Sequence, residues 1–404
     1  MTKKTDTPAI RFKGFSDTWE QRKAIDIADY SKGNGYSKGD LTDAGTPIIL
    51  YGRLYTKYQF AISEVDTFTV PRNGAVYSQG NEVIVPASGE TADDIARASA
   101  VEKSGVLLGG DLNILRPFDF INPLFLALAI SNGEPQKELA KKAQGKSVVH
   151  IHNTDIQEVT IAYPSRTEQD RIVSVFRQLD NLITLHQREY EKLHNIKKSM
   201  LEKMFPKNGS NVPEIRFKGF TEAWEQRKLG DVVQITMGQS PDGSTYSDEP
   251  SDYILVQGNA DLQNGWVCPR IWTTQITKKA DAGDLIMSVR APAGAMGKTA
   301  YNAVIGRGVA AIKGNEFIYQ LLVKMDADGF WKILSCGSTF ESLNSENIKN
   351  AEVKIPTTAE QIKIGGYFQQ LDHLITLHQR ELEKLQNIKK SMLEKMFVSE
   401  EKRK

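Results

Sequence analysis

Two pairs of repeated segments divide this chain of 404 residues. PAIRFKGFSDTWEQRK at 8–23 and PEIRFKGFTEAWEQRK at 213–228 are identical at 12 of 16 positions. LDNLITLHQREYEKLHNIKKSMLEKMF at 179–205 and LDHLITLHQRELEKLQNIKKSMLEKMF at 371–397 are identical at 24 of 27 positions. Chance does not produce identity of that length, so the chain holds two copies of one plan. Each copy has a shared lead-in, a block of its own and a shared tail.

The blocks between the shared segments, 24–163 and 229–355, show little obvious identity. Both have the pattern of mixed α/β structure, with short apolar runs between glycines and one longer stretch that predicts a helix. In the first block we expect strands at 46–56, 81–88 and 105–117 and a helix at 122–143. In the second we expect strands at 253–260, 283–292 and 305–314 and a helix at 316–334.

The shared tails predict two long helices. PSRTEQ and PTTAEQ each offer a capping box, with Ser165 paired to Glu168 and Thr357 paired to Glu360. Apolar residues then recur at helical spacing, and a histidine interrupts each series, His186 in the first and His378 in the second. The apolar positions are Ile172, Phe176, Leu179, Ile183, Tyr190, Leu193, Ile196, Met200 and Met204, then Ile364, Phe368, Leu371, Ile375, Leu382, Leu385, Ile388, Met392 and Met396.

About 40 helical residues make a rod of roughly 60 Å, longer than one such domain needs. Each helix could pack on its own domain, but a heptad-like stripe favours a partner helix, and the second copy is available. His186 and His378 hold equivalent positions in the seam between the helices, so we expect a helix–helix hydrogen bond there rather than catalysis. The predicted fold class is α+β, with two mixed α/β domains separated by two long antiparallel coiled-coil helices in a pseudo-two-fold, pseudo-cyclic repeat. The N-terminal lead-in should then pack beside the C-terminal helix, as the central lead-in packs beside the first helix.

The predicted segments follow from these repeats. They are a first domain at 1–163, a helix at 164–205, a linker at 206–212, a second domain at 213–355, a second helix at 356–397 and a charged tail at 398–404. PKNGSNVP, polar and bracketed by prolines, marks the linker.

Charge and composition narrow the function. The net charge is −5 for 24–163 and −3 for 229–355, although the whole chain carries +1. A nucleic-acid-binding surface on either block would have to be a local basic patch, because the block as a whole repels phosphate. MTKKTDTPAI does not predict a signal peptide, and the apolar run FINPLFLALAI is too short to span a bilayer. The expected location is the cytoplasm, without membrane contact. Cys268 and Cys336 are too few for a disulfide framework.

Three motifs suggest catalysis, but their contexts do not support it. APAGAMGKT resembles a phosphate-binding loop, yet Pro292 stands where the first glycine is needed, and strands rather than a helix follow. We expect Lys298 to be a solvated strand end or a DNA contact. INPLF resembles an amino-methyltransferase motif, but Leu124 replaces a proline, so Asn122 is interpreted as a helix start. His150 and His152 lack a third metal ligand nearby. We expect a non-catalytic chain with no cofactor or metal.

Two different globular domains joined by a rigid pair of helices suit a protein that recognises two short sequences at a fixed spacing, as on duplex DNA. At this point the sequence resembles the specificity subunits of type I restriction-modification systems. NEVIVPASGETADDIARAS with GVLLGGDLNILRP, and GDLIMSVRAPAGAMGKTA with IGRGVAAI, are similar to two versions of that family's target-recognition domains. KKAQGKSVVHIHNTDIQEVTIAYPSRTEQDRI and LDNLITLHQRE resemble its domain ends and spacer helices.

The resemblance implies that each domain reads one half of a split, asymmetric DNA site from the major groove, and that the spacer helices set the gap. It implies double-stranded DNA, two modification (methyltransferase) subunits and restriction (endonuclease and translocase) subunits as partners. The modification subunits would methylate an adenine in each half-site. S-adenosylmethionine, ATP and Mg²⁺ are expected on those partner subunits.

Base reading needs side-chain forks and amides at loop tips. Candidates in the first block are Tyr51, Arg53, Tyr55, Lys57, Ser88, Glu90 and Thr91, with Lys146 and Ser147 near phosphates. Candidates in the second are Gln239, Ser240, Tyr246, Gln257, Asn259, Arg290, Arg307 and Thr339. Arg290 is the leading candidate, because bidentate arginine–guanine pairing is the commonest specific contact. Any of them could instead be an ordinary strand-end or turn residue.

Two other functions stay open from the sequence. One is a DNA-binding scaffold of the same architecture without a methylation partner. The other is a coiled-coil adaptor whose two heads bind proteins. Co-purification with a methyltransferase would separate the first from the resemblance, and a two-part DNA footprint would exclude the second.

Overall fold

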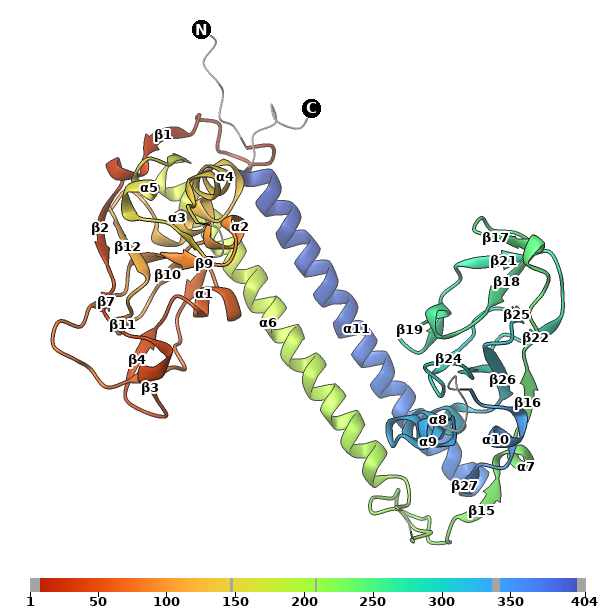
Figure 1. Cartoon of the computed structure of the whole chain (residues 1–404). Helices are drawn as coiled ribbons and strands as arrows, with labels where there is room; N and C mark the ends of the chain where they lie inside the picture. Colours follow the sequence, from red (N-terminus) through yellow and green to blue (C-terminus); the bar gives the residue numbers. More distant parts are fainter. Residues whose placement is uncertain (1–7, 146–147, 208, 336–341, 398–404) are drawn as a thin grey trace. The chain divides into compact units, whose positions relative to one another are not determined.

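The computed structural model describes residues 8–145, 148–207, 209–335 and 342–397. The chain divides into two compact units (Figure 1). Unit 1 comprises Met1–Leu185 together with Leu382–Lys404, and unit 2 comprises His186–Glu381. Each long helix thus contributes to both units. The segment boundaries expected from the sequence stay a prediction.

Unit 1 holds two five-stranded mixed sheets. The first has the order β2 (Ala28–Lys32), β12 (Leu112–Pro117), β8 (Glu82–Pro86), β10 (Ser99–Val101) and β5 (Ala61–Ile62). The second has the order β3 (Leu41–Thr42), β6 (Phe68–Thr69), β4 (Thr46–Ile49), β11 (Ser104–Leu108) and β7 (Tyr77–Gln79). Neighbouring strands are antiparallel except β10 with β5 and β4 with β11, which are parallel.

Unit 2 repeats this plan. Its first sheet has the order β16 (Gln234–Met237), β26 (Val309–Lys313), β23 (Leu285–Ser288), β24 (Met296–Lys298), β20 (Trp266–Val267) and β19 (Leu262–Gln263). Its second has the order β17 (Tyr246–Ser247), β21 (Ile271–Thr273), β18 (Tyr253–Val256), β25 (Ala303–Ile305) and β22 (Lys278–Ala280). The parallel pairs, β24 with β20 and β18 with β25, stand at the positions of the parallel pairs of unit 1. Two blocks with little obvious identity therefore share one fold.

Short helices complete each unit. They are α1 (Arg53–Thr56), α2 (Ala92–Ile95), α3 (Pro123–Ile130), α4 (Gly133–Lys142) and α5 (Asn153–Gln157) in unit 1, and α7 (Leu229–Val232), α8 (Glu316–Ala327), α9 (Phe330–Ser335) and α10 (Ser345–Lys349) in unit 2. The Asn122 side chain caps α3 by accepting N–H bonds from Leu124 and Phe125, which confirms the predicted helix start. Two-residue strand β9 (Ser88–Gly89) pairs with β13 (Val149–His150).

Several expected elements are wrong in extent. The helix expected at 122–143 is two helices, because Gly133 (φ +67°) reverses the chain between α3 and α4. The helix expected at 316–334 breaks in the same way at Gly329 (φ +77°). The strand expected at 46–56 ends at Ile49, and after a turn at Tyr51 and Gly52 the residues Arg53–Thr56 form α1.

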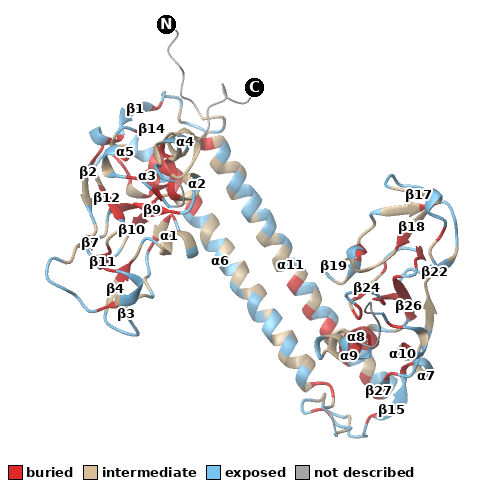
Figure 2. Ribbon diagram, in the orientation of Figure 1, coloured by how far each residue is buried: buried red, intermediate tan, exposed pale blue. Residues whose placement is uncertain are grey.

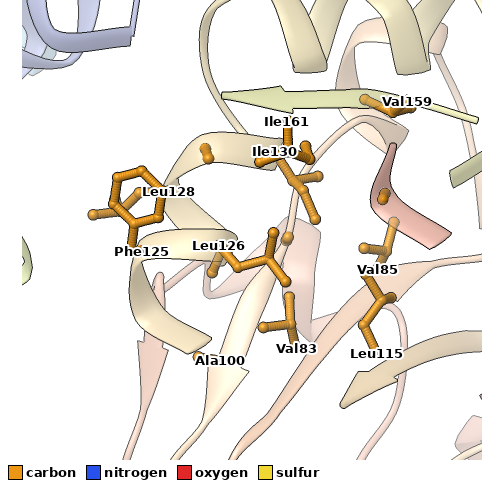
Figure 3. Close-up of a cluster of buried hydrophobic side chains, with 14 of the residues drawn as sticks. Val83, Val85, Ala100, Leu115, Phe125, Leu126, Leu128, Ile130, Val159 and Ile161 are labelled. Atoms are coloured by element: carbon orange, nitrogen blue, oxygen red, sulfur yellow. The ribbon is translucent and has the colours of Figure 1, made fainter. Parts of the chain in front are cut away.

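Apolar side chains from both the sheet and the helices build the main core of unit 1. Val83 and Val85 of β8 and Leu115 of β12 face the buried helix α3, whose residues 124–130 are all buried (Figure 3). The buried positions of unit 1 gather on β8, β10, β12 and α3, while the strands toward β3 carry more exposed positions (Figure 2). This buried core holds the sheet in place, and the sheet in turn positions the loops at its ends.

The duplicated lead-ins anchor the long helices α6 (Arg166–Lys203) and α11 (Thr358–Phe397). Arg11 donates from Nε and Nη2 to the Glu168 carboxylate, both at 2.6 Å, and Glu168 is 1% exposed. Arg216 grips Glu360 in the same way, at 2.7 and 2.8 Å. These arginines belong to the repeated IRFKGF. The predicted capping boxes are therefore incomplete: Ser165 Oγ accepts the Glu168 N–H at 3.5 Å, but both glutamate carboxylates are taken by arginine.

Each lead-in also meets the end of a long helix. Ile10 N–H donates to Lys395 O at 3.3 Å in unit 1, and Ile215 N–H donates to Lys203 O at 2.9 Å in unit 2. The lead-in strands β1 (Glu20–Lys23) and β15 (Glu225–Lys228) pair with β14 (Thr160–Tyr163) and β27 (Glu352–Ile355), directly ahead of α6 and α11. This confirms that the N-terminal lead-in packs beside the C-terminal helix.

Within each unit, stretches of α6 and α11 pack antiparallel. In unit 1, Lys389 pairs with Asp180 at 2.5 Å and Phe397 contacts Phe176. In unit 2, Lys197 pairs with Asp372, also at 2.5 Å. Ile388 was wrongly expected among the apolar positions between the helices, because it is 39% exposed. Met392 and Met396, also expected there, do pack in the core of unit 1, together with Phe397.

Among the described residues, no helix is both long and apolar enough to cross a membrane.

Candidate nucleic-acid interface

In unit 2, three loops meet at one end of the first sheet because glycines let their backbones touch. A Cβ on Gly238 would lie 2.1 Å from the Gly306 carbonyl oxygen, and a Cβ on Gly308 would lie 1.9 Å from the Gln257 carbonyl oxygen. No other residue fits at such distances. The loops after β16, after β18 and before β26 are therefore locked together.

This contact brings four of the expected reading residues into one cluster. Arg307 N–H donates to Ser240 Oγ at 3.1 Å, and Gln239 N–H donates to Ile305 O at 2.9 Å. Gln257 lies against Gly306 and Gly308. Val289 N–H donates to Gly308 O at 2.9 Å, which brings the loop that starts at Arg290 to the same edge. Arg290, Arg307 and Gln239 are exposed there.

The remaining candidates of the second block lie beside this cluster or outside the described residues. Tyr246, in β17, donates its hydroxyl to Pro241 O at 3.3 Å, one residue after Ser240. Asn259 opens the 3-10 turn η4 (Asn259–Asp261), which follows Gln257. Thr339, Lys146 and Ser147 lie outside the described residues.

In unit 1, two candidate cations are bound to an acid of the same unit. Arg53 donates to Asp66 Oδ1 at 2.6 Å and to Glu64 O at 2.9 Å, and its side chain is 8% exposed. Lys57 donates to the other oxygen of Asp66 at 2.6 Å. Lys57 and then Arg53 hold the pKa of the Asp66 carboxyl well below its usual range. Both cations order the β4–β6 loop in the free protein.

Other candidates of unit 1 also have intramolecular partners. Tyr55 donates to Ser88 O at 2.7 Å, and burial raises the pKa of that phenol. Ser88 Oγ lies 3.2 Å from His150 Nδ1. Thr91 Oγ1 accepts the Asp94 N–H at 3.1 Å and so caps α2. Tyr51, Lys57, Glu90 and Thr91 are the exposed members of this set.

Shared topology identifies candidates that the sequence analysis missed. β2 of unit 1 stands where β16 stands in unit 2, so Asn34 and Gly35 correspond to Gln239 and Ser240. Gly33 shows the same close approach as Gly238, since its Cβ would lie 1.9 Å from the Gly109 carbonyl oxygen. The shared signal is a glycine followed by a polar residue directly after the first strand of each block.

Arg72 was also missed. Its side chain is 57% exposed, donates to Gly35 O at 3.4 Å and lies over the Tyr36 ring at 5.2 Å. It pairs with Asp40, and the Ser37 N–H, Arg72 and the Ser37 hydroxyl lower the pKa of that carboxyl. The arginine stands in a proline–glycine loop whose position in space the sequence does not reveal.

Lys298 is not the solvated strand end that the sequence predicted. Its side chain is 13% exposed and lies over the rings of Trp266 and Tyr319 at 4.9 and 4.5 Å. Its ammonium donates to both oxygens of Glu316, at 2.9 and 3.2 Å. The expectation was wrong because β20 and α8, distant in sequence, close over the end of β24.

The structure shows no group of three or more metal-ligating side chains among the residues it describes. The two seam histidines form the expected contact, with His186 Nδ1 and His378 Nδ1 3.1 Å apart. His150 lies against Ser88 as described above, and His152 is the N-cap residue of α5.

Residues 16–195 and 221–387 match the family model described as the type I restriction modification DNA specificity domain. These ranges cover most of the chain, and the chain belongs to this family. It is thus a DNA-specificity subunit of a type I restriction-modification system, a class of non-catalytic DNA-recognition components.

Individual relatives agree with this assignment. The putative type I restriction enzyme MjaX specificity subunit of Methanocaldococcus jannaschii is 28% identical over 305 residues, covering 71% of this chain and 70% of the relative. The MjaVIII specificity subunit of the same organism is 21% identical over 352 residues, covering 80% and 79%.

Solved structures share the fold. The S subunit of a type I restriction-modification system from M. genitalium has a TM-score of 0.69 at 16% identity, over 97% of this chain and 99% of that one. A chain from work on complex assembly and conformational transition of the type I R-M system has a TM-score of 0.53 at 21% identity, over 94% and 98%.

Proposed function

We propose that units 1 and 2 each read one half of a split, asymmetric duplex DNA site from the major groove. One observation carries this proposal: the two units share strand order, lead-ins and tails but differ in the loops at the sheet ends. Such a chain presents two different DNA-reading surfaces, each supported by the same lead-in and long helix. In unit 2 the surface is the cluster of Arg290, Arg307, Gln239, Ser240 and Gln257, whose forks and amides suit base edges.

The long helices set the unspecified gap in this proposal. A 38-residue helix such as α6 is about 57 Å long, whereas reading heads on one face of DNA recur about every 34–36 Å. The interhelical pairs Asp180–Lys389 and Lys197–Asp372 fix the register of α6 against α11 within each unit. A fixed register gives a fixed gap.

Two identical modification subunits would dock on the duplicated surfaces. The equivalent pairs Leu182 with Leu185 and Leu374 with Leu377 are exposed on the long helices, at 41–55%. Exposed apolar side chains at the same place in each copy suit a partner that is present twice. Each modification subunit would carry S-adenosylmethionine and methylate an adenine in one half-site.

Restriction subunits would join this complex, translocate DNA and cut unmethylated DNA. They would bind the ATP and Mg²⁺ that these steps need. The partners would also supply most phosphate contacts, because both recognition blocks are acidic. We place the complex in the cytoplasm, with the DNA.

Methylation mapping tests the proposal. The chain and its modification subunit are expressed in cells that lack adenine methylation, and methylated adenines are located by single-molecule sequencing. We expect a motif of two specified parts separated by a constant gap. Exchanging 229–355 for the corresponding block of a relative should change one part only. A contiguous motif, or no methylation although the two proteins co-purify, would overturn the proposal.

Docking is tested separately. L374E together with L377E should reduce co-purification of the modification subunit, because charge at an apolar contact is costly. E383Q, a change on the same helix without added charge or apolar loss, is the matched control and should leave co-purification unchanged. Undiminished recovery with the double variant would contradict this docking surface.

A further inference from the structure

A buried aspartate organises the loop beside the reading cluster of unit 2. Asp261 is 3% exposed and ends the turn η4. Its Oδ2 accepts the N–H groups of Gln257 at 2.7 Å and Gly258 at 3.2 Å. The carboxylate thus fixes the backbone at Gln257, which touches Gly306 and Gly308 of the neighbouring loop.

The other oxygen of Asp261 holds an arginine. Arg270 donates to Asp261 Oδ1 from Nε at 3.0 Å and from Nη2 at 2.9 Å. The backbone is tied to the same residue, since Cys268 N–H donates to Asp261 O at 2.8 Å. Pro269 stands between these two attachments and restricts the chain further. Both ends of the arginine segment are therefore positioned before any ligand arrives.

The free edge of this guanidinium faces solvent. A guanidinium can present two edges that each donate a pair of N–H bonds, one with Nε and one with both terminal nitrogens. Asp261 occupies the Nε edge, and no described residue accepts a bond from Nη1. The Arg270 side chain is 53% exposed, although its acid partner is only 5% exposed. The edge with Nη1 and Nη2 can therefore donate hydrogen bonds to a ligand.

The other arginines gripped by buried acids differ in exposure. Arg11 and Arg216 bind Glu168 and Glu360 through the same Nε and Nη2 edge, but their side chains are only 12% exposed. Those two pairs hold the lead-ins in place. A side chain that is fixed by a buried acid and yet half exposed is prepared for a partner outside the chain.

We propose that Arg270, held by Asp261, is a further specificity-determining residue of unit 2 and reads a guanine in its half-site. The inference rests on the proposed function. Guanine O6 and N7 accept a pair of parallel N–H bonds, which matches the free edge of Arg270. Asp261 is the positioning residue, because it removes rotamer freedom that Arg270 would otherwise lose on binding.

The test uses the full chain with its modification subunit and the methylation mapping described above. R270A and R270K should relax one G·C pair in the half-site that changes when 229–355 is exchanged. The preference for that pair should fall about 5- to 150-fold. Lysine keeps the charge but lacks the planar fork, one edge of which Asp261 holds, so R270K should also weaken the preference. D261N should weaken the preference at the same position.

K313A is the matched control. Lys313 is also a half-exposed cation of unit 2 paired with an aspartate, Asp281 at 2.6 Å, but it stands at the opposite end of β26 from Arg307. Its loss should leave the motif unchanged. Co-purification with the modification subunit and the thermal midpoint show whether each variant is folded. If D261N does not fold, R270A and R270K alone test the role of Arg270.

Three results would overturn the inference. They are an unchanged motif with R270A, a uniform fall in methylation without altered base preference, which indicates a phosphate contact, and relaxation in the half-site of unit 1. If the wild-type chain gives no two-part motif, the proposed function itself fails. A normal wild-type motif that R270A does not alter removes only the role of Arg270.

Discussion

His186 and His378 meet ring to ring in unit 2, with Nδ1 atoms 3.1 Å apart and ring centroids 5.2 Å apart. The two residues hold the same position in the repeated tails, 192 residues apart in the chain. Equivalent residues of the two repeated tails therefore touch each other. One imidazole must donate and the other accept, so the pair cannot be symmetric in its protons.

The histidine contact should appear as a coupling in the free energy of unfolding. H186A and H378A each leave one ring without its partner, so the double variant should lose less than the sum of the singles. We expect a coupling of about 0.5–1.5 kcal/mol from a double-mutant cycle in urea. The cycle of H186A with H373A is the control and should be additive. Additivity in both cycles would mean that the contact contributes nothing.

Breaking the Arg216–Glu360 pair should destabilise the protein strongly. R216M leaves the fully buried Glu360 carboxylate without its cation, a loss of about 3–5 kcal/mol. K207M removes an exposed partner of Glu214 and should cost far less, because solvent screens an exposed ion pair. Denaturant unfolding of both variants measures the difference. Equal small losses would show that the lead-in is held by its apolar contacts alone.

G308A should disrupt the reading cluster of unit 2. Its Cβ would meet the Gln257 carbonyl oxygen at 1.9 Å, so the loops before β26 and after β18 must separate. We expect methylation to lose specificity in one half-site only. G243A is the control, since a Cβ there meets nothing within 4 Å. An unaltered motif with G308A would show that the loop contact is not needed for reading.

Asp326 should make stability depend on pH. Burial raises the pKa of its carboxyl above the unfolded value, so the unfolded chain loses this proton first as pH rises. Its contribution is therefore present at low pH and lost as pH rises through the folded pKa. D326N should raise the thermal midpoint at pH 7 and change it little near pH 3. D328N, at an exposed position paired with Lys324, should not show this pattern.

The chain without its partners should bind DNA weakly and with strong salt dependence, because both recognition blocks are acidic. Fluorescence anisotropy on duplex DNA containing the mapped motif should give an affinity that falls steeply between about 50 and 200 mM salt. Adding the modification subunit should restore tight binding. Tight binding by the chain alone at physiological salt would contradict the proposed division of phosphate contacts.

The repeats predicted the long helices, their antiparallel pairing and the lead-in packing, because identical segments must have the same surroundings. The histidine contact followed from the same argument. The capping boxes did not hold, since Arg11 and Arg216 lie far in sequence from the glutamates they bind. Nothing local distinguishes a glutamate that caps its helix from one that accepts an arginine.

The candidate site could be predicted only in part. Polar side chains at expected loop tips indicated Gln239, Ser240 and Arg307, which lie together because glycines allow close backbone contacts between their loops. The sequence does not distinguish Arg53 from Arg270. In the structure, Arg53 bonds to Asp66 and Glu64, whereas one edge of the Arg270 guanidinium is exposed to solvent. Exposure depends on which loops close over a side chain, and that is a property of the tertiary structure.

The core of unit 1 includes Met396 and packs against Phe397, so this unit is assembled from distant parts of the chain. Unit 2, in contrast, runs without interruption from His186 to Glu381. On the ribosome, the second unit can therefore finish folding first, while the N-terminal one waits for the last helical turns to emerge. That order is the reverse of the usual N-terminal-first sequence. A nascent chain arrested before those turns would expose the apolar surface of its first half to chaperones and proteases.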